Sequence, residues 1–312
     1  MTAAAALLLA ILIWASNSIM VKVVLREIDP LTLTWLRFLL AALFYVPYAA
    51  ATWRRAPRYT PREWALLLVA GVALVPAFSL TLYWALSYTT VANTALVRMT
   101  EPAWVLLLAA LLLGERATRR QLAGLALALA GTAALVLLGR QPGGAGEHHA
   151  LGIGFMVANS LAWVAYILCA KDLLRRHRVT QVTIHAALGG TAVLFLVTGP
   201  THAVTVAREA AAMSPLGWTL VVTMALAVTI GSNQLFSYGL QRVTAGAAAT
   251  YSYLTPVLSA LLAWIFLGEP VTAAVAVCGL IIAAGVYLVN RPEPGAIRAR
   301  PREPGAGPPA PP

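Results

Sequence analysis

The feature that most constrains this chain is a block of sequence that occurs twice. Residues 101–115 read EPAWVLLLAALLLGE, and residues 255–269 read TPVLSALLAWIFLGE, so a Pro and a terminal Leu-Gly-Glu keep the same spacing. The offset between the two blocks is 154 residues in a chain of 312. A fixed offset near half the chain length indicates a duplicated unit.

The duplication extends upstream of this block. Trp14 and Lys22 are matched by Trp163 and Lys171, at an offset of 149 residues. This predicts two related units followed by a short tail, at residues 1–142, 143–290 and 291–312. The tail is rich in Pro, Gly, Ala and Arg and has little to bury, so we expect it to be disordered.

The composition indicates a membrane protein. Hydrophobic residues make up 60% of the chain, charged residues make up 11%, and the mean hydropathy is +0.78. This leaves too little polar surface to coat a soluble globule. The net charge of +11 does not indicate a nucleic-acid partner, because the Arg residues lie in short loops between apolar segments.

The apolar segments have the length of membrane-spanning helices. About 20 residues of helix cross about 30 Å of hydrocarbon. Ten such spans are predicted, near residues 4–25, 31–52, 63–88, 91–114, 118–139, 150–171, 179–199, 214–240, 244–267 and 271–290. The predicted fold is therefore an all-α integral membrane protein, with ten transmembrane helices arranged as two inverted five-helix repeats.

The positive charges predict the orientation of these spans. Five spans per repeat make the second repeat enter the membrane in the opposite sense, so equivalent loops should differ in charge. Arg116, Arg119 and Arg120 follow the first Leu-Gly-Glu, whereas no positive charge follows the second. With both termini in the cytoplasm, 16 Lys and Arg residues lie inside and 3 lie outside. We expect a multi-pass membrane protein with this orientation.

The sequence resembles a known family at several of these positions. They are the Trp14-Ala15-Ser16-Asn17 element followed by Lys22, the Leu36-Arg37-Phe38 element, and the doubled block that ends in Leu-Gly-Glu. Together they resemble EamA-type members of the drug/metabolite transporter superfamily, and the chain is similar to aromatic amino-acid and metabolite exporters among them. The resemblance implies an inner-membrane carrier in which the fifth and tenth helices lie outside the pathway. The first block begins with Glu101 and the second with Thr255, so any role of this acid would belong to one half.

Four charged residues fall inside predicted spans, where a charge is costly unless it faces water or a partner: Lys22, Arg37, Arg98 and Glu101. Arg98 and Glu101 are close enough for an ion pair, which would be structural or would bind substrate. Lys22 is expected to reach the interface as a membrane anchor. Arg37 lies too deep for that and is either a tie to a neighbouring helix or a ligand.

Polar and aromatic residues at helical spacing predict a cavity. Asn159, Trp163 and Tyr166 share one stripe of the sixth span, and Trp14 and Asn17 share the equivalent stripe of the first. The full set of predicted substrate-binding residues is Trp14, Asn17, Tyr83, Trp84, Tyr88, Asn93, Arg98, Glu101, Trp104, Asn159, Trp163, Tyr166, Asn233, Tyr238 and Tyr251.

The sequence offers no enzyme site. It contains no paired intramembrane carboxylates, no metal-ligand spacing, no nucleophile elbow and no phosphate-binding loop, so we expect neither catalysis nor a metal or cofactor. His148 and His149 lie in a Gly-rich outer loop and are expected to be solvated.

The function predicted from these features is export of small amphipathic metabolites by alternating access. The expected substrates are amino acids with aromatic or apolar side chains, or related toxic compounds. A lipid-linked or nucleotide-sugar translocator, and a non-transporting membrane assembly protein, are the alternatives. The expected partners are a small-molecule substrate and the lipid bilayer, and the sequence is compatible with a monomer. Glu101 is a candidate proton carrier, although a facilitator would need none.

Overall fold

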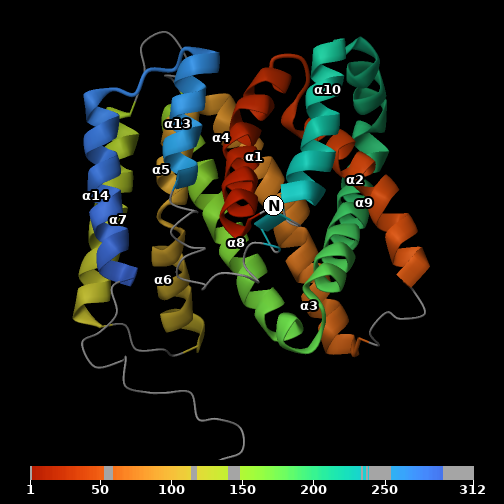
Figure 1. Ribbon diagram of the computed structural model, residues 1–312, viewed down its shortest axis with the longest axis horizontal. Helices are drawn as coiled ribbons and strands as arrows, with labels where there is room; N and C mark the ends of the chain where they lie inside the picture. The colour runs from red at the N-terminus through yellow and green to blue at the C-terminus, as the bar shows by residue number, and fades with distance from the viewer. Residues whose placement is uncertain are drawn as a thin grey trace, which may run out of the picture.

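The computed structural model describes residues 2–52, 59–113, 118–139, 148–232, 235–236, 238 and 254–290, and within them the regular structure is entirely helical. In the order of the chain, the elements are α1 (Ala3–Val24), α2 (Pro30–Thr52), α3 (Pro61–Val72), η2 (Ala73–Ala77), α4 (Phe78–Tyr88), α5 (Val91–Arg98), α6 (Glu101–Leu113), α7 (Arg119–Leu138), α8 (His149–Arg176), α9 (Val179–Ala212), α10 (Pro215–Thr223), η3 (Met224–Gly231), α13 (Leu254–Leu267) and α14 (Ala273–Asn290). Figure 1 shows them as one bundle whose helices run between its upper and lower ends.

The predicted membrane fold is confirmed. Within the described residues, six helical stretches are long and apolar enough to cross a bilayer: Ala3–Val24, Pro30–Thr52, Pro61–Tyr88, Arg119–Leu138, His149–Tyr166 and Thr180–Ala212. Shorter apolar helices follow at Pro215–Gly231, Leu254–Leu267 and Ala273–Val289. Together, α5 and α6 cover the predicted fourth span. The seventh span differs, because α9 continues through Pro200 to Ala212 instead of ending near residue 199.

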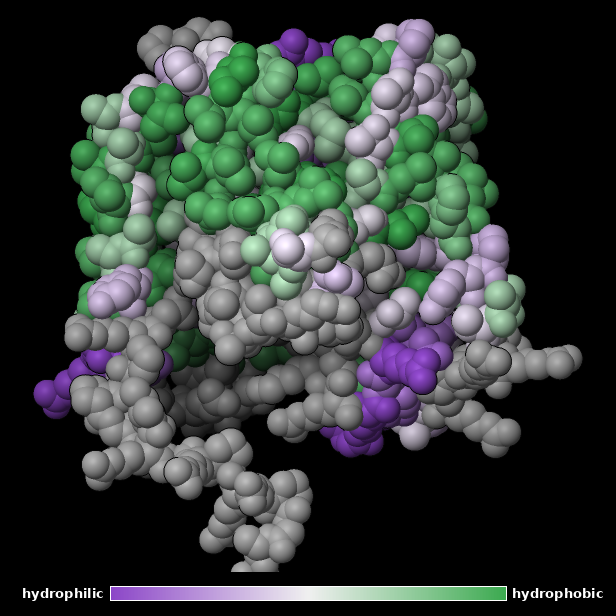
Figure 2. Space-filling model, viewed as in Figure 1, coloured by the Kyte–Doolittle hydropathy of each residue, from purple (hydrophilic) through white to green (hydrophobic). Residues whose placement is uncertain are grey.

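The surface of the bundle suits a lipid environment. Large apolar side chains are exposed along most helices, among them Leu137, Leu196, Val204 and Leu280, each more than two-thirds exposed. Figure 2 shows apolar residues over the upper part and the flanks of the molecule in this view, and strongly hydrophilic residues mainly at its lower left and lower right. A monomer in water rarely exposes this much contiguous apolar surface, so this face is expected to meet lipid.

The fifth and tenth spans, α7 and α14, pack against each other at one edge of the bundle (Figure 1). A Cβ atom on Gly285 would lie 2.5 Å from the backbone nitrogen of Ala128 and 2.7 Å from the carbonyl oxygen of Gly124. Further along α7, Gly131 meets Ile282. Residues with higher numbers in α7 meet residues with lower numbers in α14. These equivalent helices therefore run antiparallel, as inverted repeats require. Small residues here let two helix backbones touch.

A second close helix crossing joins α3 to α9. A Cβ atom on Gly190 would lie 2.1 Å from the carbonyl oxygen of Gly71, and one on Gly71 would lie 2.2 Å from the carbonyl oxygen of Ala186. The neighbouring Gly189 is different, because its nearest atom would be a flexible Leu68 methyl group at 3.8 Å.

The third and eighth spans each contain a π-helical segment. The third span is α3, η2 and α4, and Pro76 in η2 has no N–H for a regular helical hydrogen bond. The eighth span is α10 and η3, in which the Thr229 hydroxyl donates to the carbonyl of Met224, five residues earlier, at 3.1 Å. Such segments are frequent at functional sites because they free backbone groups for other partners.

The fourth span is broken into α5 and α6 at Met99 and Thr100. Pro102, at the start of α6, cannot donate to the carbonyl of Arg98, and its ring disfavours a continuous helix there. The break leaves Arg98 in the last turn of α5 and Glu101 in the first turn of α6. Each charge is favourable in the field of its own helix end.

Candidate functional site

The helix break in the fourth span holds two charges that face each other. The Nε atom of Arg98 lies 4.0 Å from Oε1 of Glu101, and both side chains are partly accessible. Arg98 also donates from Nη2 to Oδ1 of Asn159, on α8, at 3.4 Å. All of these contacts are long, so neither charge is tightly saturated by its protein partners.

Asn159 ties this pair to the third span. It is fully buried and donates from Nδ2 to the carbonyl oxygen of Phe78 and, at 3.4 Å, to the hydroxyl of Thr81. Phe78 is the first residue after the π segment η2. The hydrogen bond from the Asn159 amide to a backbone carbonyl beside the π segment holds the side chain in one orientation. Asn159 is therefore a rigid part of the site.

Aromatic rings continue from these polar groups. The Phe78 ring has Arg98 on one side, 5.3 Å from the guanidinium carbon to the ring centroid, and Trp163 on another, with centroids 5.4 Å apart. Trp163 in turn lies 5.4 Å from Tyr166. We call this group the Arg98 cluster, comprising Phe78, Thr81, Arg98, Glu101, Asn159 and Trp163.

A second aromatic patch lies further along α4 and α8. Trp84 and Phe155 have ring centroids 5.3 Å apart, and Tyr88 stacks on Phe155 at 6.1 Å. The Trp84 and Tyr88 rings therefore share the α8-facing side of α4 with Phe78 and Thr81, as expected from their spacing.

A second polar group surrounds Arg37, about 10 Å into α2 from its first residue at 1.5 Å of rise per residue. Arg37 is 8% exposed. It donates from Nη1 to Tyr83 Oη at 2.7 Å and to Asn17 Oδ1 at 3.3 Å, and from Nε to Thr229 Oγ1 at 3.0 Å. Tyr45 donates to the carbonyl of Thr229 at 3.2 Å. We call this group the Arg37 cluster, comprising Asn17, Arg37, Tyr45, Tyr83 and Thr229.

The two clusters are related by the repeat. The Arg98 cluster joins the sixth span to the π segment of the third, and the Arg37 cluster joins the first span to the π segment of the eighth. Trp14, the equivalent of Trp163, packs on Phe236 with centroids 5.0 Å apart. Each half of the chain therefore contributes a tryptophan, an amide and a π segment to the interior.

Asn93 lies in a different place from these clusters. It is fully buried and donates from Nδ2 to the Thr89 hydroxyl at 3.0 Å and to the carbonyl of Gly139 at 2.9 Å. These contacts connect the start of α5 to the end of α7. The geometry gives Asn93 a role in holding helix ends together.

The expectation that His149 is solvated is wrong. His149 is 3% exposed, with Nδ1 2.9 Å from the Thr89 hydroxyl and Nε2 3.0 Å from the carbonyl oxygen of Leu135. The chain re-enters the bundle one residue earlier than the Gly-rich loop suggests, so α8 begins at His149 itself. His148 is exposed, as expected.

The remaining predicted residues are spread around the bundle. Trp104 donates to the Thr100 hydroxyl at 2.9 Å and lines an open, mainly apolar cavity of about 360 Å³ between α6, α7 and α8. Tyr238 lies in a short described piece after η3. Asn233 and Tyr251 lie outside the described residues.

Lys22 was expected to be a membrane anchor, but it pairs with the glutamate of the second Leu-Gly-Glu. Gly268 takes a positive φ of 66°, which turns the chain sharply after α13. Glu269 then forms an ion pair with Lys22 and accepts a hydrogen bond from the backbone N–H of Val91, at the start of α5, at 2.8 Å. One carboxylate thus joins α1, α5 and the turn between α13 and α14.

Three groups in the clusters were missed by the sequence reading: Tyr45, Phe78 and Thr229. Phe78 and Thr229 take part through the π segments, and the spacing of residues in the sequence does not predict a π segment. Among the described residues, no three His, Cys, Asp or Glu side chains come together as a metal site.

Buried charges, discontinuous helices and inverted repeats define the class of secondary transporters. The EamA-like transporter family matches the chain at residues 1–137 and again at residues 150–291, so the chain belongs to that family.

The chain is similar over nearly its whole length to several named relatives. An uncharacterized transporter of Archaeoglobus fulgidus is 30% identical, covering 91% of this chain and 96% of the relative. A probable terminal-alkyne amino-acid exporter of Streptantibioticus cattleyicolor is 27% identical, covering 92% of each. A probable amino-acid metabolite efflux pump of Salmonella typhimurium is also 27% identical, covering 90% and 92%. A solved crystal structure with 23% identity matches the fold with a TM-score of 0.56, covering 92% of this chain and 96% of that one.

Proposed function

We propose that this transporter exports small amphipathic metabolites by alternating access, with amino acids that carry aromatic or apolar side chains as its main substrates. The observation that supports this most is the Arg98 cluster. It presents an incompletely paired Arg98 and Glu101 beside the apolar rings of Phe78 and Trp163. An amphipathic molecule needs this combination of charge and aromatic surface.

The relatives support the same substrate class. Two of them are named as a probable amino-acid exporter and a probable amino-acid metabolite efflux pump. We extend that class to this chain because both relatives align with it over about nine-tenths of its length.

The proposed movement is a rocking of the two repeats about a site near mid-membrane. The π segments η2 and η3 and the break between α5 and α6 are the points at which helices can bend without losing regular hydrogen bonds. We assign proton coupling to Glu101, because it is the acidic residue that the sequence places well inside a predicted span. Glu101→Gln should lose export driven by a pH gradient, with a smaller decrease in substrate exchange in the absence of a gradient.

We propose a location in the bacterial inner membrane, as the family implies, and we infer from the positive charges that both termini lie in the cytoplasm. Thr118, before α7, and Thr272, before α14, are equivalent positions in the two repeats. Cysteines introduced at these two positions should react with a membrane-impermeant reagent from opposite sides of the membrane. Labelling of both from one side would contradict this orientation.

The test of the proposed function is substrate exchange by the purified protein in proteoliposomes. Trp163→Ala should lower exchange of L-phenylalanine about tenfold or more, since it removes a ring from the site. Trp64→Ala is the matched control, because Trp64 is 51% exposed on the outside of α3. Equal exchange by the two variants would remove Trp163 from the pathway, and no exchange of any amphipathic metabolite by the wild type would refute the function.

A further inference from the structure

The Arg37 cluster contains a positive charge without a counter-charge. Arg37 is buried, and its hydrogen-bond partners are the neutral side chains of Asn17, Tyr83 and Thr229. Within the described residues, no carboxylate lies within 4.0 Å of the guanidinium. A buried charge of this kind is unfavourable unless an ion of opposite charge compensates it.

The acids of the chain are engaged elsewhere. The six acidic side chains that the structure describes, out of 11 Asp and Glu in the sequence, all have other partners. Glu269 pairs with Lys22, Glu101 faces Arg98, Glu63 binds His177, Asp29 binds His202, Glu209 accepts from the N–H of Asp29, and Glu27 accepts from Ser214. By sequence, the other five acids lie at span ends or in the C-terminal tail.

The polar groups around Arg37 that have no partner are hydrogen-bond donors. The guanidinium uses Nε and Nη1 toward protein oxygens, which leaves the two N–H bonds of Nη2. Tyr83 and Asn17 accept from Arg37 through their oxygens, which leaves the Tyr83 hydroxyl proton and the Asn17 amide protons. Within the described part of the chain, none of these donors has an acceptor.

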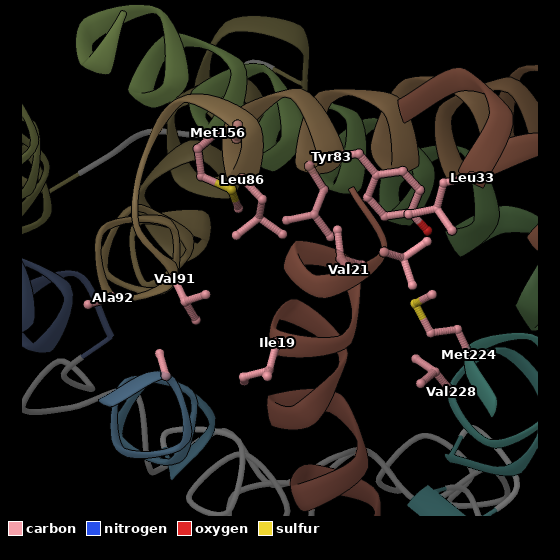
Figure 3. Close-up of a cluster of buried hydrophobic side chains, with 14 of the residues drawn as sticks. Ile19, Val21, Leu33, Tyr83, Leu86, Val91, Ala92, Met156, Met224 and Val228 are labelled. Carbon is pink, nitrogen blue, oxygen red and sulfur yellow. The ribbon is translucent and has the colours of Figure 1, made fainter. Parts of the chain in front are cut away.

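The apolar packing around the cluster fixes these donors in place. Tyr83 is fully buried in the main hydrophobic core. Figure 3 shows its ring beside Leu33 of α2, with Met224 and Val228 of the eighth span on the side of its hydroxyl. A guanidinium and a phenol held in this way form a preorganised site for an acceptor-only ligand of negative charge.

We propose that the Arg37 cluster binds the carboxylate of the transported substrate. This inference rests on the proposed function and refines it, because it makes a carboxylate a requirement for efficient transport. Arg98 is less suited to that task, since Glu101 already opposes its charge. The same donors would also bind a small inorganic anion such as chloride. The experiment distinguishes a substrate carboxylate from an inorganic anion.

The test compares matched pairs of molecules that differ by a carboxylate: L-phenylalanine with 2-phenylethylamine, and L-leucine with isoamylamine. Affinity is measured by competition in proteoliposomes and by the shift in unfolding temperature of the detergent-solubilised full chain. The wild type should prefer the carboxylate-bearing member of a pair at least tenfold. Arg37→Gln should abolish this preference by weakening the amino acid alone, with the amine changed less than twofold.

Two further variants guard against a folding defect. Tyr83→Phe keeps the ring and removes one donor, so it should lower the preference three- to tenfold while the protein still folds. Arg26→Gln is the control, because Arg26 is an exposed arginine just after α1. It should leave the preference unchanged.

The chloride arm repeats the measurements with chloride replaced by isethionate at equal ionic strength. Chloride-dependent stabilisation that disappears in Arg37→Gln, with the amino-acid preference intact, would place an inorganic anion there and overturn the proposal. An unchanged preference in both Arg37→Gln and Tyr83→Phe would also overturn it, while wild-type transport of amino acids would leave the proposed function standing. If the wild type bound no member of either pair, both conclusions would fall together.

Discussion

Lys22 and Glu269 form an ion pair across the two repeats, between the last turn of α1 and the turn that follows α13. Glu269 is the last residue of the second Leu-Gly-Glu, so the motif serves as a clasp between helices that are far apart in the sequence. Because the same carboxylate also accepts from the backbone of Val91, the clasp fixes three helix ends at one point.

The first prediction concerns this clasp. Lys22→Met and Glu269→Gln should each lower the free energy of unfolding by about 1–2 kcal/mol, since both side chains are largely shielded from solvent. The double variant should lose clearly less than the sum of the two single losses. The measurement is thermal unfolding in detergent, and strictly additive losses would show that the pair contributes nothing.

The second prediction uses two adjacent glycines of α9. Gly190→Ala should destabilise the protein by about 2 kcal/mol or more, because the new methyl group would meet the backbone of Gly71 at 2.1 Å. Gly189→Ala should be neutral or slightly stabilising, since its methyl group meets only a flexible Leu68 side chain at 3.8 Å. The unfolding temperatures of the two variants decide this, and equal values would contradict the close crossing of α3 and α9.

The third prediction separates two adjacent histidines. His149→Ala should lower the free energy of unfolding by about 2 kcal/mol, because it removes two hydrogen bonds of a buried side chain, to the Thr89 hydroxyl and to the Leu135 carbonyl. His148→Ala should have little effect on stability. Substrate exchange per folded molecule should stay unchanged in both, and a selective loss of exchange in His149→Ala would assign that residue to the pathway.

The fourth prediction concerns pH and Asp29, which lies in the loop before α2. Burial alone would raise the pKa of this carboxyl, but hydrogen bonds from Thr32 and Leu31 and the nearby His202 outweigh it, so the pKa is lowered. A lowered pKa stabilises the folded state above the unfolded pKa, and the contribution is lost as the pH falls through the folded value.

Asp29→Ala should therefore cost about 1 kcal/mol at neutral pH, where the carboxylate accepts from the first turn of α2. The difference from the wild type should shrink as the solution becomes strongly acidic. Unfolding at a series of pH values measures this, and a difference that grows toward acid would refute the assigned sign.

The fold was predictable because its determinants are local and repeated. Span length, the doubled block and the polar stripes of Trp163 and Trp14 are read directly from residue spacing. The π segments were not, because they depend on which backbone groups find partners in three dimensions. The ion pair of Lys22 with Glu269 was missed for a related reason, since it joins residues 247 apart.

The sequence predicted which types of residue form the candidate site better than it predicted which of them lie together. The spacing indicated the pair Arg98 and Glu101 on one helix and the pair Asn159 and Trp163 on another, and the structure brings the two pairs together through Arg98 and Asn159. Asn93 carries the same amide and is as fully buried as Asn159, yet it connects helix ends through its hydrogen bonds to Thr89 and Gly139. Neighbours from distant segments decide between these outcomes, and a single sequence does not record them.

The seam between α7 and α14 is built from equivalent segments of the two repeats, with Ala128 against Gly285 and Gly131 against Ile282, which is the counterpart of Ala128 at the 154-residue offset. Gly285 is itself the counterpart of Gly131 at the 154-residue offset. Such a contact is self-complementary, the form that a two-fold axis imposes on an isologous dimer. The fused chain thus preserves at this edge the interface that two separate, oppositely inserted five-helix subunits would have shared.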